Sequence, residues 1–218
     1  MTTSNTNGSS SLLSQSEQQK LIKKLGVFKI QGTDKRRLPI LRIVGKLFPG
    51  KLVGVETLKK FFEAEIFPSL NGRRFSVVYV HSGVNRSENS PGILAMKSMF
   101  DAVPAEVGQN VEAVYFLHPS LQCRLFLATF GRILFSGAAA SGFYGKMRYV
   151  KTLNLLRNSV RWYKLEMPEF VYEYDEEKEE EHCPKMDFGL ESDHPRLSTY
   201  RAPSLDWTIS TYSMRSIA

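Results

Sequence analysis

The sequence lacks several features that would assign it to particular protein classes. Two cysteines among 218 residues cannot form a disulfide scaffold, so the composition favours a reducing compartment. No segment approaches the ~18 uncharged apolar residues that a membrane-spanning helix needs. Residues 1–19 contain no Lys or Arg and no apolar core, so they do not resemble a signal peptide. We therefore expect a cytoplasmic protein.

Charge is divided unevenly along the chain. Residues 173–218 contain 11 acidic and 5 basic side chains, whereas residues 1–172 contain 24 basic and 11 acidic ones. A basic body is typical of proteins that meet an anionic partner, such as a phospholipid surface or a phosphorylated ligand. The arginine pairs at 36–37 and 73–74 are not interleaved with aromatic residues in a nucleic-acid-binding motif, so no nucleic acid is expected.

Strand-like and helix-like patterns alternate through the middle of the chain. Apolar, branched segments at 38–44, 74–80, 111–117, 147–150 and 169–174 predict strands. Helical spacing predicts helices over 55–67, from about 91 to 100, over 121–135 and over 152–163. This order predicts an α/β domain with a mixed, mainly parallel sheet over residues 38–175. Around it we expect a disordered segment (1–16), a short basic helix with a linker (17–37) and an acidic, proline-containing disordered tail (176–218).

Three catalytic or metal-binding motifs are incomplete in this sequence. GKLFPGKL (45–52) fits the first part of a phosphate loop, but Leu52 replaces the magnesium-binding Ser or Thr and Pro49 removes a backbone N–H. Ser82 follows a strand as a hydrolase nucleophile would, but VHSGV lacks the first glycine of the nucleophile elbow. His182 and Cys183 are adjacent and lack zinc-site spacing. We expect no enzyme activity, no cofactor and no metal.

Two histidines stand at the ends of predicted strands. His81 follows the strand at 74–80, and His118 follows the strand at 111–117. Open α/β sheets usually bind ligands beyond the carboxyl ends of their strands, so the two imidazoles are candidates for a polar pocket mouth. The alternative is that each ring only satisfies backbone groups of its own loop.

The predicted helix at 121–135 (LQCRLFLATFGRILF) is apolar around most of its circumference. A surface helix normally has one apolar stripe, so this helix is either buried on all sides or contacts a ligand, lipid or partner. Basic residues lie near it in the sequence: Arg132, Lys146, Arg148 and Lys151. An apolar surface ringed by cations suits docking to an anionic bilayer. The pattern alone does not separate a buried helix from a docking helix.

Several segments together resemble the divergent CRAL-TRIO lipid-binding domain of phosphatidylinositol-transfer-like and BCH-type proteins. They are YVHSG (79–83), VEAVYFLHPS (111–120), LFLATFGRILFS (125–136), MRYVKTLNLL (147–156) and MPEFVYEYD (167–175). The resemblance covers roughly residues 38–175. It implies a hydrophobic pocket between sheet and helices, with residues 121–135 as a gate helix that opens at a membrane. The helical domain that often precedes the fold has no clear counterpart in residues 1–37.

The resemblance implies a non-enzymatic protein that binds or exchanges a phospholipid or another hydrophobic ligand and associates transiently with anionic membranes. The expected pocket-lining residues are Val78, Val80, Tyr115, Leu117, Leu125, Phe126, Phe130, Ile133, Tyr149 and Val150. Arg132, Lys146, Arg148 and Lys151 are the expected membrane or head-group contacts, with His81 and His118 at the mouth. The alternative is an interaction module that binds a small GTPase or its regulator without transferring lipid.

Overall fold

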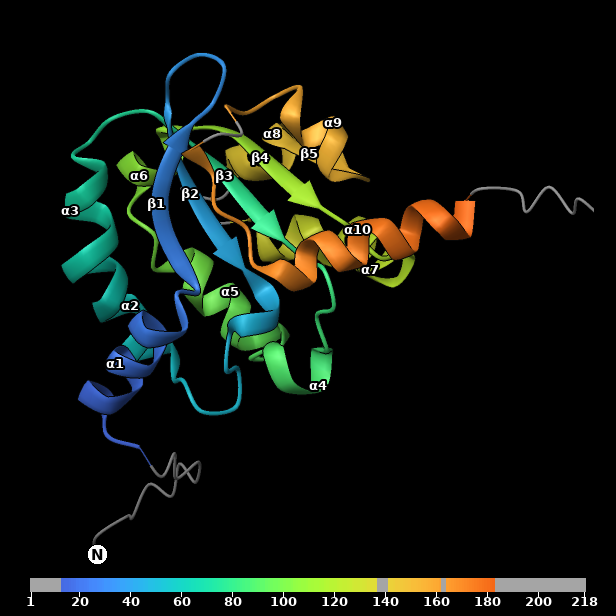
Figure 1. Cartoon of the computed structure of the whole chain (residues 1–218). Coiled ribbons are helices and arrows are strands. Elements are labelled where there is room, and N and C mark those ends of the chain that lie inside the picture. Colours follow the sequence, from blue (N-terminus) through green and yellow to red (C-terminus); the bar gives the residue numbers. More distant parts are fainter. Residues whose placement is uncertain (1–12, 137–140, 162–163, 183–218) are drawn as a thin grey trace, which may run out of the picture. The chain divides into compact units, whose positions relative to one another are not determined.

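A five-stranded sheet with the order β1-β2-β3-β4-β5 forms the centre of the computed structural model (Figure 1). The structure describes residues 13–136, 141–161 and 164–182, all of which belong to one unit. The strands are β1 (Phe28–Thr33), β2 (Pro39–Val44), β3 (Phe75–Val80), β4 (Val111–Leu117) and β5 (Met147–Val150). β1 pairs antiparallel with β2, and the other neighbours are parallel. The predicted mixed, mainly parallel α/β sheet is confirmed.

Helices cover both faces of this sheet. On one face lie α1 (Gln15–Leu25), α2 (Val55–Phe61), η2 (Phe62–Ile66), α3 (Phe67–Leu70), α5 (Ile93–Asp101), α6 (Ala105–Gln109), α7 (Leu121–Leu134) and α8 (Ser141–Lys146). On the other face lie α9 (Leu153–Arg157) and α10 (Glu169–His182). In Figure 1, α10 crosses in front of the strands and α7 lies behind them. The short helices η1 (Gly45–Leu47) and α4 (Arg86–Asn89) follow β2 and β3.

Because both faces are covered, successive residues of one strand pack into different cores. Val77 and Val114 join the core beneath α2 and α3, whereas Val78 and Tyr115 join the core beneath α9 and α10. The register agrees, because Val77 pairs with Val114 and Val78 pairs with Tyr115. This alternation decides which residues can line a cavity on either face.

The N-terminal helix α1 is stabilised by local caps and by packing on α2. Ser14 and Glu17 form a capping box, and Gly26 ends the helix in the left-handed conformation that glycine adopts without strain. Ile22 is fully buried, and the Gln18 side chain accepts a hydrogen bond from the Gly54 N–H at 3.0 Å. These contacts supply the tertiary support that an eleven-residue helix needs.

Four elements differ from the sequence prediction. The predicted strand at 169–174 is wrong, because these residues form the start of α10, which continues to His182 through the first residues of the predicted tail. The predicted linker contains strand β1, and α8 forms in a segment for which no element is predicted. The predicted helix at 152–163 is a short α9 that ends at Arg157. Residues 1–12 and 183–218, which include most of the predicted tails and Cys183, lie outside the described residues.

Candidate functional site

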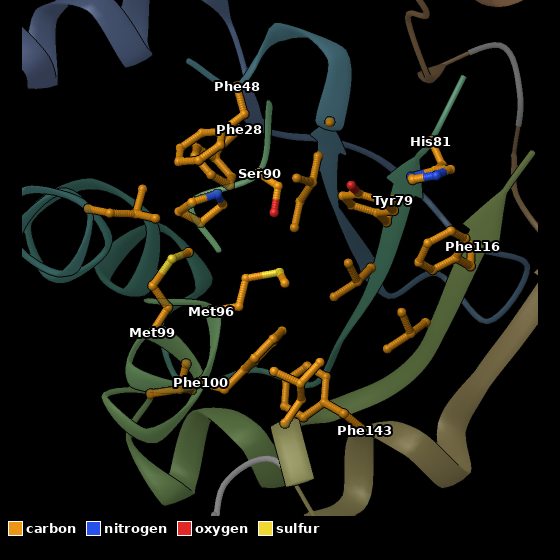
Figure 2. A pocket seen from close by; sticks show the side chains of 18 of the residues that line it. Phe28, Phe48, Tyr79, His81, Ser90, Met96, Met99, Phe100, Phe116 and Phe143 are labelled. Carbon is orange, nitrogen blue, oxygen red and sulfur yellow. The ribbon is translucent and has the colours of Figure 1, made fainter. Parts of the chain in front are cut away.

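An apolar cavity of about 380 Å³ lies between the sheet and the helices of the α2–α7 face (Figure 2). Its walls are mostly aliphatic, aromatic and methionine side chains. The sheet contributes Leu41, Ile43, Val77, Tyr79, Val114, Phe116 and Met147, and the helices contribute Leu58, Phe62, Met96, Met99, Phe100, Phe126, Leu127, Leu134, Phe135 and Phe143. Methionines fill irregular apolar space and adapt their shape to what they contact. A concave, mainly apolar cavity with few polar groups is the usual form of a small-molecule site.

Aromatic rings enclose this cavity from several elements. Figure 2 shows Phe28 and Phe48 at one end, Phe100 and Phe143 at another, and Tyr79 and Phe116 along the strands. Phe100 packs against the ring of Phe135 with centroids 4.7 Å apart, and Tyr79 packs against Phe116 at the same separation. Burial raises the pKa of the Tyr79 hydroxyl, so this group stays protonated.

His81 is one of the polar groups in this mainly apolar wall. Its ring packs against Tyr79 and Phe116, with centroids 5.9 and 5.4 Å apart. Its Nδ1 atom is buried and has no hydrogen-bond partner within the described part of the chain. Burial lowers the pKa of His81 to about 4, so the ring is neutral at pH 7. His81 lies in the cavity lining, whereas the predicted partner His118 does not.

The other predicted ligand-binding residues mostly lie elsewhere. Val78, Val80, Tyr115, Leu117 and Val150 do not line the cavity, because they point to the α9–α10 face and are buried in its core. Leu125, Phe130, Ile133 and Tyr149 are exposed and also fall outside the lining. Phe126 is the member of the predicted set that lines the cavity.

The cause of this difference is a one-residue error in the choice of strand face. Alternate residues of a strand point to opposite faces of the sheet. The residues on the same face as Val77 and Tyr79 line the cavity, and those on the same face as Val78 do not. His81 shares the parity of Val77 and Tyr79, so the histidine that the prediction placed at the pocket mouth could have identified the correct face.

The outer surface of α7 is apolar and exposed. The exposed fractions are 64% for Leu121, 60% for Leu125 and 54% for Ile133. The opposite side of the helix is buried through Leu127 and Leu134. Thus α7 lies over the cavity with one face inward and presents large apolar side chains outward, which excludes the interpretation of a helix buried on all sides.

The four predicted membrane or head-group cations do not gather in one place. Arg132 is exposed on the outer side of α7. The Lys146 ammonium donates hydrogen bonds to the carbonyl groups of Gln109 and Val111, at the start of β4. Arg148 lies on the opposite sheet face and lines a small polar hollow with Asp34 and Tyr115. Lys151 is exposed after β5.

His118 lies away from the cavity, in a buried hydrogen-bonded chain. Its Nδ1 atom is 2.7 Å from the Ser82 hydroxyl, and its Nε2 atom is 2.7 Å from the Asp175 carboxylate. The Leu153 N–H donates to both Asp175 oxygens, at 2.9 and 3.1 Å. Since an ionised carboxylate only accepts hydrogen bonds, Nε2 carries the proton and Nδ1 accepts from the Ser82 hydroxyl. These hydrogen bonds join the ends of β3 and β4 to α10.

The three side chains of this hydrogen-bonded series are those of a serine hydrolase triad, but the serine is inaccessible. Ser82 has no exposed surface and does not line the cavity, so a substrate carbonyl has no path to its hydroxyl. Burial lowers the pKa of His118, although the hydrogen bond and charge of Asp175 act in the opposite direction. The arrangement suits a structural clasp. We therefore call Ser82, His118 and Asp175 the clasp.

The sequence prediction missed two parts of this arrangement. It placed His118 at the pocket mouth, whereas the structure places it in the clasp. It placed Asp175 directly after the predicted strand at 169–174 and gave it no role, because the 57 positions between His118 and Asp175 leave no local signal for this pair. Among the described residues, no group of three or more His, Cys, Asp or Glu side chains is arranged to hold a metal ion.

Comparison with known families assigns the fold. The model described as "Divergent CRAL/TRIO domain" matches residues 37–177, so the chain belongs to this family. This match covers every strand from β2 to β5 and all the residues of the cavity wall except those contributed by α1–β1. The family gives the fold of a lipid-binding domain.

Similar curated proteins carry the name ganglioside-induced differentiation-associated protein 2. The chain is 26% identical over 147 residues to the Xenopus tropicalis protein, covering 66% of this chain and 28% of that protein. It is 24% identical to the human protein and 25% identical to the Danio rerio protein over the same length, covering 28% and 27% of those proteins. The chain spans less than a third of the length of these relatives. In the described residues, no helix has the length and hydropathy needed to cross a bilayer.

Proposed function

We propose that this chain binds a hydrophobic ligand non-covalently in the cavity beneath α7. The observation that carries the proposal is the apolar cavity itself, closed on one side by the sheet and on the other by α2, α5 and α7. Burying apolar groups contributes about 0.8 kcal/mol per methylene, so a dozen buried methylenes contribute about 10 kcal/mol before the cost of association. No reacting group is required for this function.

We further propose that α7 is the element through which the ligand enters and leaves at an anionic membrane. Leu121, Leu125 and Ile133 form an apolar outer surface, and the exposed Arg124 and Arg132 lie on the same helix. Apolar side chains insert at the boundary between head groups and acyl chains, while cations interact with anionic head groups. Movement of α7 outward would open the cavity that its inner face covers.

The test of ligand binding uses the full chain purified under native conditions from a eukaryotic host. Native mass spectrometry should detect a stoichiometric hydrophobic ligand, and delipidated protein should take one up from vesicles. A Met96→Trp variant places a bulky indole ring in the cavity and should lose this uptake. Protein that carries no ligand and extracts none from vesicles would refute the proposal.

The test of docking compares two exposed aliphatic residues that lie on helices over opposite faces of the sheet. Ile133→Asp on α7 should reduce co-sedimentation with phosphatidylserine-containing vesicles, because it places a carboxylate in the membrane-facing surface. Leu155→Asp on α9 is the matched control, since Leu155 is 51% exposed but lies beyond the other sheet face. Equal effects of both substitutions would reject α7 as the docking helix.

A protein-interaction module for a small GTPase or its regulator is the alternative function. The same exposed surface of α7 would then contact a protein, and Ile133→Asp would weaken partner capture without changing vesicle binding. The two assays on one variant therefore separate the alternatives.

A further inference from the structure

A polar hollow lies on the α9 side of the sheet, across the strands from the apolar cavity. Every lining side chain carries a polar or charged group. The lining residues come from the β1–β2 loop, from β4, from β5 and from the segment after α9: Asp34, Lys35, Arg36, Tyr115, Arg148, Asn158 and Ser159. The hollow therefore offers chemistry that the cavity beneath α7 does not.

Backbone contacts between distant segments hold this lining together. The Lys35 N–H donates to the Ser159 carbonyl at 3.2 Å, which joins the β1–β2 loop to the segment after α9. Arg148 of β5 pairs with Tyr115 of β4 in the parallel register. Paired residues of neighbouring strands point to the same face of a sheet, so these two side chains lie beside each other.

The β1–β2 loop is fixed by the buried carboxylate of Asp34, which is 2% exposed. Its Oδ1 atom accepts from the Arg36 and Leu38 N–H groups, both at 2.9 Å, and its Oδ2 atom accepts from the Ser76 hydroxyl at 2.9 Å. Both carboxylate oxygens are thus engaged in folding the loop. The backbone that carries Lys35 and Arg36 is held in place before any ligand binds, which reduces the ordering cost of binding.

Positive charge exceeds negative charge around the hollow. Lys35 and Arg148 form no salt bridge within the described segments. The Glu112 carboxylate at the start of β4 is shared by two arginines, Arg36 and Arg74. Even with the carboxylate of the loop included, four basic side chains face two acidic ones. This surplus favours an anion.

The Tyr115 hydroxyl adds a neutral donor on a rigid support. Its ring is packed in the core of the α9–α10 face, and the residue is 6% exposed. In the part of the chain that the structure describes, this hydroxyl has no hydrogen-bond partner, and the buried side-chain atoms that lack one are Arg42 Nε and His81 Nδ1. The Tyr115 hydroxyl is therefore not sealed in the core and opens into the hollow that the residue lines.

We infer that the polar hollow binds a phosphate monoester group, carried by a small soluble molecule or by a lipid head group. Such a group has a charge of about −1.5 to −2 at pH 7 and three strong acceptor oxygens. The guanidinium groups of Arg36 and Arg148 pair with these oxygens through several N–H groups, and Lys35 and Tyr115 supply further donors. The inference does not depend on the proposed function, because the two sites lie on opposite faces of the sheet.

The test titrates the full chain with inorganic phosphate at neutral pH and constant ionic strength, followed by two-dimensional amide NMR. Saturable shifts should appear at the amides of residues 34–38 and 158–160, with a dissociation constant in the millimolar range. Acetate at the same concentrations is the control anion. It should cause much smaller shifts, because it carries one charge and two acceptor oxygens.

Three variants assign the binding to the hollow, and circular dichroism verifies that each is folded. Arg148→Gln should weaken phosphate binding roughly tenfold, because a charge-assisted contact is lost. Tyr115→Phe keeps the ring and the charge and should weaken binding roughly threefold. Arg73→Gln removes the same charge from an exposed arginine outside the lining and should change the affinity by less than about twofold.

Vesicle co-sedimentation then identifies the source of the phosphate group. Phosphatidic acid carries a phosphate monoester, whereas phosphatidylserine is anionic without one. If Arg148→Gln reduces binding to phosphatidic acid vesicles but not to phosphatidylserine vesicles, the ligand is a lipid head group. If Arg148→Gln weakens phosphate binding and leaves both kinds of vesicle bound as the parent does, the ligand is a soluble phosphorylated molecule.

Three results would overturn the inference. One is the absence of saturable phosphate shifts, or equal shifts with acetate. Another is an unchanged affinity in Arg148→Gln or in Tyr115→Phe, which would indicate an adventitious ion only. The last is an equal loss in Arg148→Gln and Arg73→Gln, which would show that net charge alone attracts phosphate. None of these results bears on ligand binding in the apolar cavity.

Discussion

Removal of the Asp175 carboxylate should destabilise the domain strongly, because this group satisfies two buried donors at once. It accepts from His118 Nε2 at 2.7 Å and from the Leu153 N–H at 2.9 and 3.1 Å. Asp175→Ala leaves both donors without a partner in a site that is 9% exposed or less. Each buried unsatisfied group costs about 1–3 kcal/mol, so the free energy of unfolding should fall by about 3 kcal/mol.

Graded variants make this prediction more specific. Asp175→Asn keeps one acceptor oxygen and should lose about half as much stability as Asp175→Ala. Ser82→Ala removes only the hydroxyl that donates to His118 Nδ1 and should cost about 1 kcal/mol. Glu176→Gln is the control, because Glu176 is exposed at the next position of α10 and should change stability by less than about 0.5 kcal/mol.

The assay is equilibrium urea unfolding of the full chain followed by far-ultraviolet circular dichroism, with a thermal scan in parallel. For a domain of this size a loss of 3 kcal/mol lowers Tm by about 6–12 °C. The reasoning is refuted if Asp175→Ala unfolds within about 0.5 kcal/mol of the parent, or if Glu176→Gln loses as much stability as Asp175→Ala.

Three further predictions concern the cavity and the two sheet faces. The pKa of His81 is about 4 in the folded chain against about 6.5 unfolded, so its contribution to stability is complete above about pH 6.5 and is lost as the pH falls through 4. The stability difference between parent and His81→Phe, measured by urea unfolding, should therefore change by about 3 kcal/mol between pH 7 and pH 4, and a constant difference would contradict the shift. Gly45→Ala should lower stability by about 1–3 kcal/mol, because a Cβ there would lie 2.5 Å from the Tyr79 hydroxyl oxygen, and an unchanged Tm would show that this contact relaxes freely. Val77→Phe should change the free energy of unfolding little, because its ring enters the cavity, whereas Val78→Phe should lower it by about 3 kcal/mol in a packed core. Equal losses would contradict the assignment of these two residues to opposite faces of the sheet.

Elements with strong local patterns could be predicted from the sequence. VEAVYFL and MRYV form β4 and β5 over the predicted residues, and the long apolar helix is α7 with one residue fewer. The branched and aromatic side chains of the two strands and the length of the apolar helix favour these assignments. β1 was missed because its residues alternate between apolar and polar over only six positions at the sheet edge.

The residues predicted as the last strand form a helix, because their neighbours in the sequence and in the fold outweigh their local strand propensity. Phe170, Val171 and Tyr172 favour a strand, which is why the sequence predicts one. The glutamates that follow are good helix formers, and the helix buries Val171 against the core while Asp175, one turn later, reaches His118. Both side chains face the sheet because residues four apart share one face of a helix. A strand over the same residues would also place them on one face, so the pattern alone does not decide between the two.

The face of the cavity could not be read from the strands, and this has a physical cause. In a sheet covered on both sides, both faces of each central strand are apolar, so the alternation that normally separates inside from outside is absent. The face to which each strand residue points must then be read from a polar residue whose hydrogen bonds or surroundings fix its orientation. His81 and Ser82 provide it here: the ring of the first enters the cavity wall, and the hydroxyl of the second binds His118 on the way to α10. Two adjacent polar residues at the end of β3 thus separate the ligand site from the clasp, and the polar strand ends carry the information that the apolar strands lack.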